Sequence, residues 1–151
     1  MKIYLASDHA GFELKEDIKK YLAEKNISYE DMGTFSTESV NWVEYGAKAA
    51  DKVSQDPEHS QAVLVCGSGI GMSIVANKFK NVRAALCNDP YAVEMSRKHN
   101  NANVLTMGAR VIDKDEAYQI LDIWFKTPYE GGRHQTRLDY LRDFVEKNNF
   151  K

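Results

Sequence analysis

The sequence predicts an α/β fold: a three-layer α/β/α sandwich around a five-stranded parallel sheet, with one further helix appended at the C-terminus. Short β-branched runs alternate five times with longer amphipathic runs, a pattern typical of parallel sheets covered by helices on both faces. The 151 residues match the commonest size of a single domain, and no linker, repeat or low-complexity tract divides them. We therefore expect one domain over residues 1–151.

The expected strands are short runs rich in apolar residues. They span residues 2–7, 28–31, 61–65, 82–86 and 103–107. The third run is apolar at four successive positions, from Ala62 to Val65. A strand of that kind has both faces covered, so we expect it at the centre of the sheet.

The expected helices follow the strands one by one. They span residues 12–25, 42–54, 70–79, 90–98 and 113–126. In the second, the apolar stripe expected to face inward consists of Val43, Ala47, Ala50 and Val53. Asp89 is expected to cap the fourth helix before Pro90, and Asp113 or Asp115 to cap the fifth.

One amphipathic segment remains, at about residues 133–147, after the strand–helix units are assigned. Its apolar stripe consists of Leu138, Leu141, Phe144 and Val145. Such a stripe has to be buried against the chain's own domain or against another subunit. We expect a partner subunit to cover it.

Composition excludes several classes of protein. The chain has 20 basic and 22 acidic residues, a net charge of −2, so we expect no nucleic-acid partner. The longest charge-free stretch, residues 60–77, is interrupted by glycines and serines, and the N-terminal apolar run is too short for a signal peptide. Two cysteines, Cys66 and Cys87, form no disulfide framework. We expect a cytoplasmic protein that does not bind membranes.

The strongest local motif is Cys-Gly-Ser-Gly-Ile-Gly at residues 66–71, between an expected strand and helix. Its glycines allow a tight turn in which successive N–H groups point at an anion. A purely structural turn would explain the same glycines. Met72 stands where a P-loop has lysine and where a dinucleotide fingerprint has a small residue. A nicotinamide-cofactor interpretation is weakened but stays open, because Asp89 follows Gly69 by a suitable interval.

Cys66 lies at the rim of this loop. The amide groups and the helix dipole favour a thiolate there, which could act as a nucleophile or a general base. A lone cysteine at a strand end is nevertheless more often a packing residue. Cys87 has no comparable loop beside it and is interpreted as structural.

Further polar residues stand near the ends of other elements. Asp8 and His9 follow the first expected strand, although Asp8 is equally suited to cap the next helix. His99 follows the end of the fourth expected helix, where it could transfer protons near neutral pH or simply complement the helix dipole. Each of these residues is a candidate for the site, with a structural alternative.

Arginines begin the last helix. Arg133 and Arg137 are four residues apart and therefore share one face, with His134 beside the first. Two guanidinium groups can clamp a phosphate, and Arg110 after the fifth strand is a third candidate. A solvated charged face would account for the same spacing.

Two other chemistries lack the residues they need. We find no histidines and carboxylates at metal-ligand spacing in the sequence, so no metal site is expected. Gly67-Ser68-Gly69 contains a serine, but its spacing differs from the nucleophile motif of serine hydrolases.

Together these motifs resemble the family of type B ribose-5-phosphate isomerases and the related galactose-6-phosphate and allose-6-phosphate isomerases. The resemblance covers nearly the whole chain. The matching segments are residues 7–11 (Ser-Asp-His-Ala-Gly), residues 66–71, residues 76–78 (Ala-Asn-Lys), His99-Asn100, residues 103–105 (Asn-Val-Leu) and residues 129–134 (Tyr-Glu-Gly-Gly-Arg-His). The resemblance implies a Rossmann-like sandwich, a homodimer that can pair into a tetramer, and no metal or organic cofactor.

The resemblance also implies roles for individual residues. Cys66 would move a proton between C1 and C2 of the sugar, and Ser68 would move a proton between the two oxygens. His99 would open the furanose ring, and Asp8 would hold the ring oxygen or a hydroxyl. The backbone amides around the enediolate would come from Gly67, Gly69, Ile70 and Gly71. The remaining substrate contacts would come from His9, Asn100, Arg110, Arg133, His134 and Arg137, with Arg133, His134 and Arg137 supplied by the neighbouring subunit.

One segment departs from the family pattern. Many members have Asp-Tyr-Pro after the second strand, where this chain has Asn41-Trp42-Val43. Because that region borders the sugar in the family, a hexose phosphate (allose 6-phosphate or galactose 6-phosphate) is an alternative to ribose 5-phosphate. A non-catalytic sugar-phosphate or nucleotide binding protein is the alternative from another functional class. The expected activity is a metal-independent interconversion of D-ribose 5-phosphate and D-ribulose 5-phosphate through an enediolate.

Overall fold

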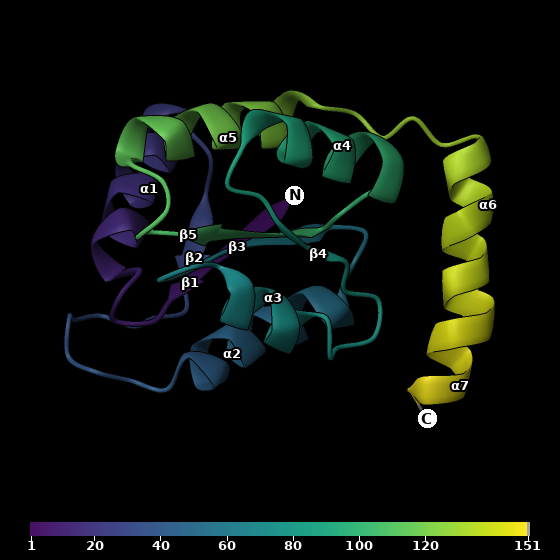
Figure 1. Ribbon diagram of the computed structural model, residues 1–151, viewed down its shortest axis with the longest axis horizontal. Helices are drawn as coiled ribbons and strands as arrows, with labels where there is room; N and C mark the ends of the chain where they lie inside the picture. The colour runs from purple at the N-terminus through teal and green to yellow at the C-terminus, as the bar shows by residue number, and fades with distance from the viewer. Residues whose placement is uncertain (151) are drawn as a thin grey trace.

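Five parallel strands form a single sheet in the order β2-β1-β3-β5-β4 (Figure 1). The computed structural model describes residues 1–150. The strands are β1 (Lys2–Ser7), β2 (Tyr29–Asp31), β3 (Ser60–Cys66), β4 (Ala84–Leu86) and β5 (Val104–Gly108). Every residue of β3 is buried, because β1 and β5 flank it and helices cover both faces. The expected parallel sheet and its central strand are confirmed.

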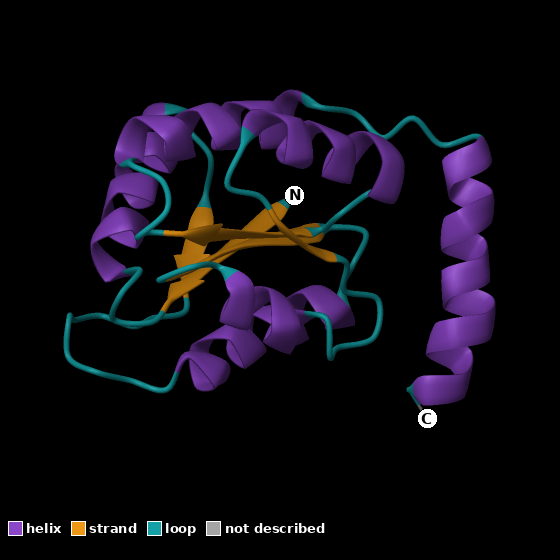
Figure 2. Ribbon diagram, viewed as in Figure 1, coloured by secondary structure: helices purple, strands orange, loops and turns teal. Residues whose placement is uncertain are grey.

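Helices cover both faces of the sheet, which confirms the three-layer architecture (Figure 2). One layer consists of α1 (Phe12–Glu24), α4 (Pro90–Asn100) and α5 (Lys114–Lys126), and the other of α2 (Trp42–Gln55) and α3 (Ile70–Ala76). Alternate residues of the strands enter the two layers: Leu5 packs with the first and Ala6 with the second. This alternation produces two apolar cores on a fully covered sheet.

The caps of α4 and α5 are formed by residues that the sequence predicts for this role. The Asp89 side chain accepts a hydrogen bond of 2.8 Å from the N–H of Ala92 and caps α4, as expected. Of the two candidates for α5, Asp113 is the cap, because its carboxylate and that of Glu116 bond reciprocally to each other's backbone N–H groups.

The largest boundary difference lies between α3 and β4. Helix α3 ends at Ala76 rather than at residue 79, and β4 begins at Ala84 rather than at residue 82. The Asn77 side chain donates to the carbonyl oxygens of Ser73 and Ala84 and accepts from the Ala84 N–H. Asn77 therefore ends the helix and fixes the start of the strand. The other boundaries differ from expectation by at most two residues.

The inward face of α2 differs from the expected stripe. Val43 is 40% exposed and Ala47 is only half-buried, so the prediction is wrong at these two positions. The other two expected positions are buried: Ala50 and Val53. Gly46 points toward α3 instead, where an added methyl group would lie 2.6 Å from Cγ1 of Val75. The absent side chain lets the two helices approach closely.

The C-terminal segment forms one helical rod that stands to the side of the three layers (Figure 1). It consists of α6 (Arg133–Tyr140), a π-helical stretch η1 (Leu141–Glu146) and α7 (Lys147–Asn149). Two residues of its apolar stripe, Phe144 and Val145, are 56% and 39% exposed. A hollow of about 380 Å³ separates the rod from the edge of its own domain. The chain's own domain thus covers only part of the stripe.

Among residues 1–150, no helix combines the length and the apolar character required to cross a membrane.

Candidate active site

The Cys66 thiol lies at the carboxyl edge of the sheet, where β3 ends and the glycine loop of residues 67–71 begins. Gly69 has a φ of +82°, a left-handed conformation that glycine adopts without strain. This turn brings the Gly69 N–H to 3.1 Å from Sγ of Cys66, to which it donates a hydrogen bond. The loop therefore directs one backbone N–H donor at the sulfur.

Asp8 is brought to the same edge by β1, the neighbour of β3. Its N–H donates to the carbonyl oxygen of Val65 at 3.2 Å, and its Oδ1 accepts from the N–H of Gly11 at 3.0 Å. The buried carboxylate also lines the pocket that contains Cys66. Asp8 therefore serves both the turn before α1 and the pocket.

The loop after Cys66 is fixed by neighbouring strands. Ser68 Oγ accepts from the N–H of Ile70 at 3.2 Å. Asn88 donates to the Ser68 carbonyl at 3.3 Å and accepts from the Gly108 N–H at 2.8 Å. A methyl group at Gly108 would lie 2.6 Å from the Ser68 carbonyl oxygen, so β5 and the loop approach through glycine. Asn88 was not among the residues predicted for the site, although it lies two residues after the expected strand end at Leu86, where ligand-binding residues gather.

Arg110 covers the other side of the loop. Its N–H donates to the Gly67 carbonyl at 2.9 Å, and a methyl group added to Gly67 would lie 3.3 Å from the guanidinium Nη1. No ion pair with a carboxylate occupies this guanidinium within residues 1–150. It is therefore available to an anionic ligand.

These residues surround a pocket of about 500 Å³, which we call the Cys66 pocket. Its polar walls are Asp8, Cys66, Ser68 and Arg110 together with the backbone of Gly67 and Gly71. Its rim is apolar and consists of Trp42, Ile70 and Ile74. Such a combination of an apolar rim with a few convergent polar groups is typical of small-molecule sites.

Trp42 lies on this rim at the point where the sequence departs from the family pattern. A methyl group at Gly71 would lie 3.1 Å from Cδ2 of Trp42, so the indole rests against the glycine loop. Ile70 and Ile74 beside it are 52% and 54% exposed. The rim is thus an apolar surface that the chain itself leaves uncovered.

His9 does not line the Cys66 pocket, although it follows Asp8 directly. Its Nδ1 accepts a hydrogen bond of 3.2 Å from the N–H of Val40. This contact assigns the ring proton of the neutral form to Nε2, which leaves Nε2–H as a donor.

His99 and Asn100 lie at the opposite edge of the sheet. Helix α4 begins at Pro90, after β4 has reached the carboxyl edge, and then runs back past the sheet. At 1.5 Å per residue, the nine steps from Pro90 to His99 carry the chain about 14 Å along the helix axis. Asn101, just beyond, lines a small pocket with Met1 and Ser60, which begin or precede strands. One chain therefore does not bring His99 to the Cys66 pocket.

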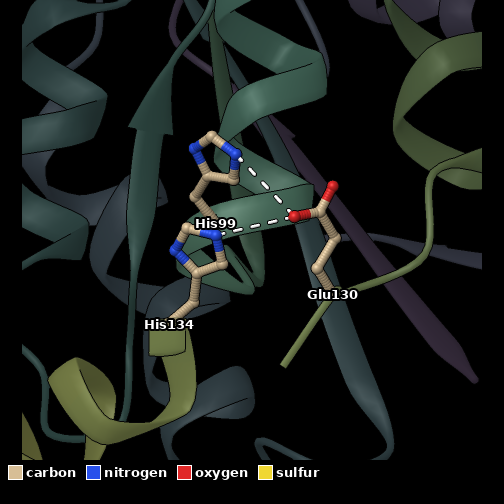
Figure 3. A group of neighbouring side chains, drawn as sticks. All are labelled: His99, Glu130 and His134. Atoms are coloured by element: carbon tan, nitrogen blue, oxygen red, sulfur yellow. Dashed lines mark ion pairs between the residues drawn. The ribbon is translucent and has the colours of Figure 1, made fainter. Parts of the chain in front are cut away.

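His99 instead belongs to a second group, the His99 cluster, which consists of His99, Glu130 and His134 (Figure 3). The two imidazole rings are stacked, with centroids 4.2 Å apart and an interplanar angle of 13°. A Glu130 carboxylate oxygen lies 4.0 Å from Nε2 of His99 and 3.5 Å from Nε2 of His134. Burial lowers the pKa of His134, and the proximity of His99 adds to the same shift, so the neutral form of the His134 ring is favoured.

Arg133 and Arg137 begin α6 on either side of His134. Both side chains are exposed, and neither forms an ion pair with a carboxylate in residues 1–150. The sequence-predicted residues are therefore divided between two places in one chain. Asp8, Cys66, Ser68, the loop and Arg110 surround the pocket, whereas His99, Asn100, Arg133, His134 and Arg137 lie around the His99 cluster.

The expectation that histidines and carboxylates do not gather is wrong for the His99 cluster. Each of its three residues offers one ligand atom, and these atoms all lie within 4.8 Å of one another. The pair Glu130 and His134, four residues apart, was visible in the sequence. Their approach to His99 was not, because β5 and α5 separate the segments along the chain.

Comparisons with known proteins found similar sequences and similar structures. A family model described as Ribose/Galactose Isomerase matches residues 3–141. The chain is 40% identical to ribose-5-phosphate isomerase B of Escherichia coli (strain K12), over 98% of this chain and 99% of that protein. The solved structure of ribose-5-phosphate isomerase B from Clostridium thermocellum has a TM-score of 0.92 at 40% identity, covering 98% of this chain and 99% of that one.

A further solved structure contains a ligand. It is ribose-5-phosphate isomerase B from Mycoplasma genitalium with bound ribulose-5-phosphate, with a TM-score of 0.93 at 34% identity and coverage of 97% of both chains. Two independent kinds of similarity, in sequence and in three-dimensional structure, thus extend over nearly the full length. The chain belongs to the ribose/galactose isomerase family.

Proposed function

We propose that this protein is an aldose–ketose isomerase that interconverts D-ribose 5-phosphate and D-ribulose 5-phosphate. The observation that carries the proposal is the Cys66 thiol, which lines a pocket and accepts a backbone hydrogen bond from the loop that follows it. The ribose-5-phosphate isomerase B relatives and the relative with bound ribulose-5-phosphate support the same substrate pair.

The reaction requires a base that moves one proton between adjacent carbons. The Cys66 thiolate takes the proton from C2 of the open-chain aldose, and the carbonyl electrons move to O1 to give an enediolate. The same sulfur then returns the proton to C1, which forms the ketose, while Ser68 transfers a proton between O2 and O1. A base of this kind contributes about 10²-fold to 10⁴-fold to the rate.

The negative charge of the enediolate needs donors that are already in position. The loop amides between Gly67 and Gly71 supply them, and the Asn88 contacts and the close approach of Gly108 hold the loop in place. Of these amides, Gly69 and Ile70 donate to Cys66 Sγ and Ser68 Oγ in the structure, so the enediolate oxygens have to replace those acceptors. Donors fixed before the reaction stabilise the developing charge by several kcal/mol without reorganising. Arg110 beside the loop adds a positive charge.

We further propose that two copies of the chain form each site. One copy contributes the Cys66 pocket, and the other contributes His99 for ring opening with Asn100, Arg133, His134 and Arg137 for the substrate. The exposed rim of Trp42, Ile70 and Ile74 and the incompletely covered C-terminal rod support this assembly. We expect a homodimer, and a cytoplasmic location is consistent with its two free thiols.

A hexose phosphate is the alternative substrate, because Trp42 borders the pocket where the sequence departs from the family pattern. Turnover of ribose 5-phosphate, allose 6-phosphate and galactose 6-phosphate, measured side by side, distinguishes them. A large preference for either hexose would overturn the proposed substrate.

The chemical step is tested with Cys66→Ser in deuterated water. The wild type is expected to introduce deuterium at C1 or C2 of the sugar phosphate, and Cys66→Ser to reduce turnover by about 10²-fold or more while it still binds substrate. Cys87→Ala is the matched control, since Cys87 packs in the core between α1, α4 and α5. Binding without any deuterium incorporation in the wild type would instead identify a non-catalytic sugar-phosphate binding protein.

A further inference from the structure

The His99 cluster has the ligand types of a divalent transition-metal site. Two imidazoles and one carboxylate offer ligand atoms that all lie within 4.8 Å of one another (Figure 3). We propose that this cluster binds a late first-row divalent cation of the zinc type, and that the bound ion withdraws His99 from the isomerisation. The ion is thus an inhibitor and takes no part in the reaction itself.

The distances fit an ion of this size after a small adjustment. Zinc binds imidazole nitrogen and carboxylate oxygen at about 2.0–2.2 Å, so tetrahedral ligand atoms lie about 3.3 Å apart. The Glu130 oxygen is 3.5 Å from Nε2 of His134 and 4.0 Å from Nε2 of His99. Each ligand pair involving Glu130 therefore closes by less than 1 Å on binding.

The ring orientations also have to change. At an interplanar angle of 13° the nitrogen lone pairs lie in two nearly parallel ring planes, so one ring has to turn before both can point at one ion. The His99 side chain is 36% exposed and can turn about χ2, whereas the His134 side chain is 6% exposed. We assign the movement to His99, which is also the ring that loses its role when the ion binds.

The two segments that supply the ligands are already joined without an ion. The N–H of Glu130 donates to the carbonyl oxygen of Lys98 at 3.1 Å, which fixes the Glu130 segment to the end of α4. His134 lies four residues after Glu130, in the first turn of α6, and His99 follows Lys98 directly. A metal therefore finds its three ligands close together and has little chain entropy to overcome.

The ligand types select the metal. Imidazole suits zinc, copper, nickel and cobalt, whereas magnesium and calcium prefer oxygen ligands throughout. The single negative charge of Glu130 offsets part of the ion's charge, and the exposed guanidinium groups of Arg133 and Arg137 oppose binding. Both guanidinium groups are exposed, so solvent and salt screen that repulsion.

Cobalt(II) provides a readout that does not depend on activity. Titration of the full-length protein is expected to produce visible d–d absorption that saturates at one ion per chain. Glu130→Gln is expected to weaken this binding by roughly 10-fold or more, because it removes the only charged ligand. Glu38→Gln, an exposed glutamate in a loop, is the matched control and is expected to bind as the wild type does.

Cys66 is the competing soft ligand and has to be separated from the cluster. Cobalt bound to Cys66 would show sulfur-to-metal charge-transfer absorption and would be lost in Cys66→Ser. We expect no such absorption, and unchanged d–d absorption in Cys66→Ser. Absence of d–d absorption in the wild type, equal affinity in Glu130→Gln, or loss of the absorption in Cys66→Ser would each overturn the proposed site.

Inhibition is the second readout, and it rests on the proposed function. Zinc is expected to reduce isomerase turnover reversibly, with recovery on chelation and no effect of magnesium. Glu130→Gln, compared with its own metal-free rate, is expected to need roughly 10-fold more zinc. An unchanged rate at saturating zinc would overturn the inhibition, whereas a metal-free wild type without isomerase activity would overturn the proposed function and leave the cobalt result to decide the site.

Discussion

The division of the predicted site between two places in one chain makes a quantitative prediction for mixed variants. Cys66→Ser damages the Cys66 pocket, and Arg137→Ala damages the group around the His99 cluster. If each site takes its pocket from one copy and Arg137 from the other, a mixed dimer contains one doubly damaged site and one intact site. Random pairing of equal amounts makes half of the dimers mixed, so about one quarter of all sites are intact.

The assay is isomerase turnover after the two variants have been unfolded together and refolded, or mixed under conditions that exchange subunits. The expected rate is about 25% of the wild type, whereas the separately refolded variants give only their own low rates. Arg110→Ala is the matched control, because Arg110 covers the same loop that follows Cys66. Its mixture with Cys66→Ser contains no intact site and should show no recovery.

Two results would refute the reasoning. If the Arg137→Ala mixture gave only the average of the two single variants although mixed dimers had formed, the site would belong to one chain. If the Arg110→Ala mixture recovered as much activity as the Arg137→Ala mixture, Arg110 would act on the partner's substrate and the proposed division would be wrong.

Three further predictions concern stability, thiol reactivity and loop geometry. Asp31→Asn removes the nearer carboxylate partner of the fully buried Lys15 and leaves only Glu16 at 3.7 Å, so we expect a loss of about 3 kcal/mol in urea unfolding. Burial alone would raise the pKa of Asp31, but hydrogen bonds from Lys15 and other donors lower it. The contribution of Asp31 to the free energy of unfolding is therefore fully present above about pH 4 and is lost as the pH falls below that value. The Asp31→Asn variant should lack this pH dependence. Burial raises the pKa of Cys87 to about 11, so alkylation at pH 8 followed by mass spectrometry should label Cys66 alone, and rapid double labelling would contradict this. Asn88→Ala should lower kcat more than it raises KM, since it loosens the loop without touching the phosphate, and a change confined to KM would contradict that role.

Local sequence patterns predicted most of the architecture because the forces involved are local. Apolar alternation, the Asp89 and Asp113 caps and the glycine loop each depend on residues within a few positions of one another. The errors arise where distant segments meet. Asn77 joins α3 to β4 through its side chain. Gly46 faces inward because α3 lies against it. Neither contact produces a periodic pattern of apolar residues in the sequence.

The same distinction between local and distant residues decides which parts of the candidate site could be predicted. Residues at or just beyond strand ends, such as Asp8, Cys66 and Arg110, could be grouped from the sequence, because parallel strands end at a common edge. The position of His99 depends on the direction and length of α4, and its contact with Glu130 depends on how the chain returns after α5. These are properties of tertiary structure, and the resemblance to a family gave His99 a role without placing it apart from the Cys66 pocket.

The direction of α4 has a consequence for how the protein works at low abundance. This helix starts near one edge of the sheet and ends at the other. If two copies form each site as proposed, a solitary copy has no complete catalytic centre. Specific activity should then decline on dilution, in proportion to the fraction of subunits that have dissociated from their partner. The output of such an enzyme rises more steeply than its own concentration, without any additional regulator.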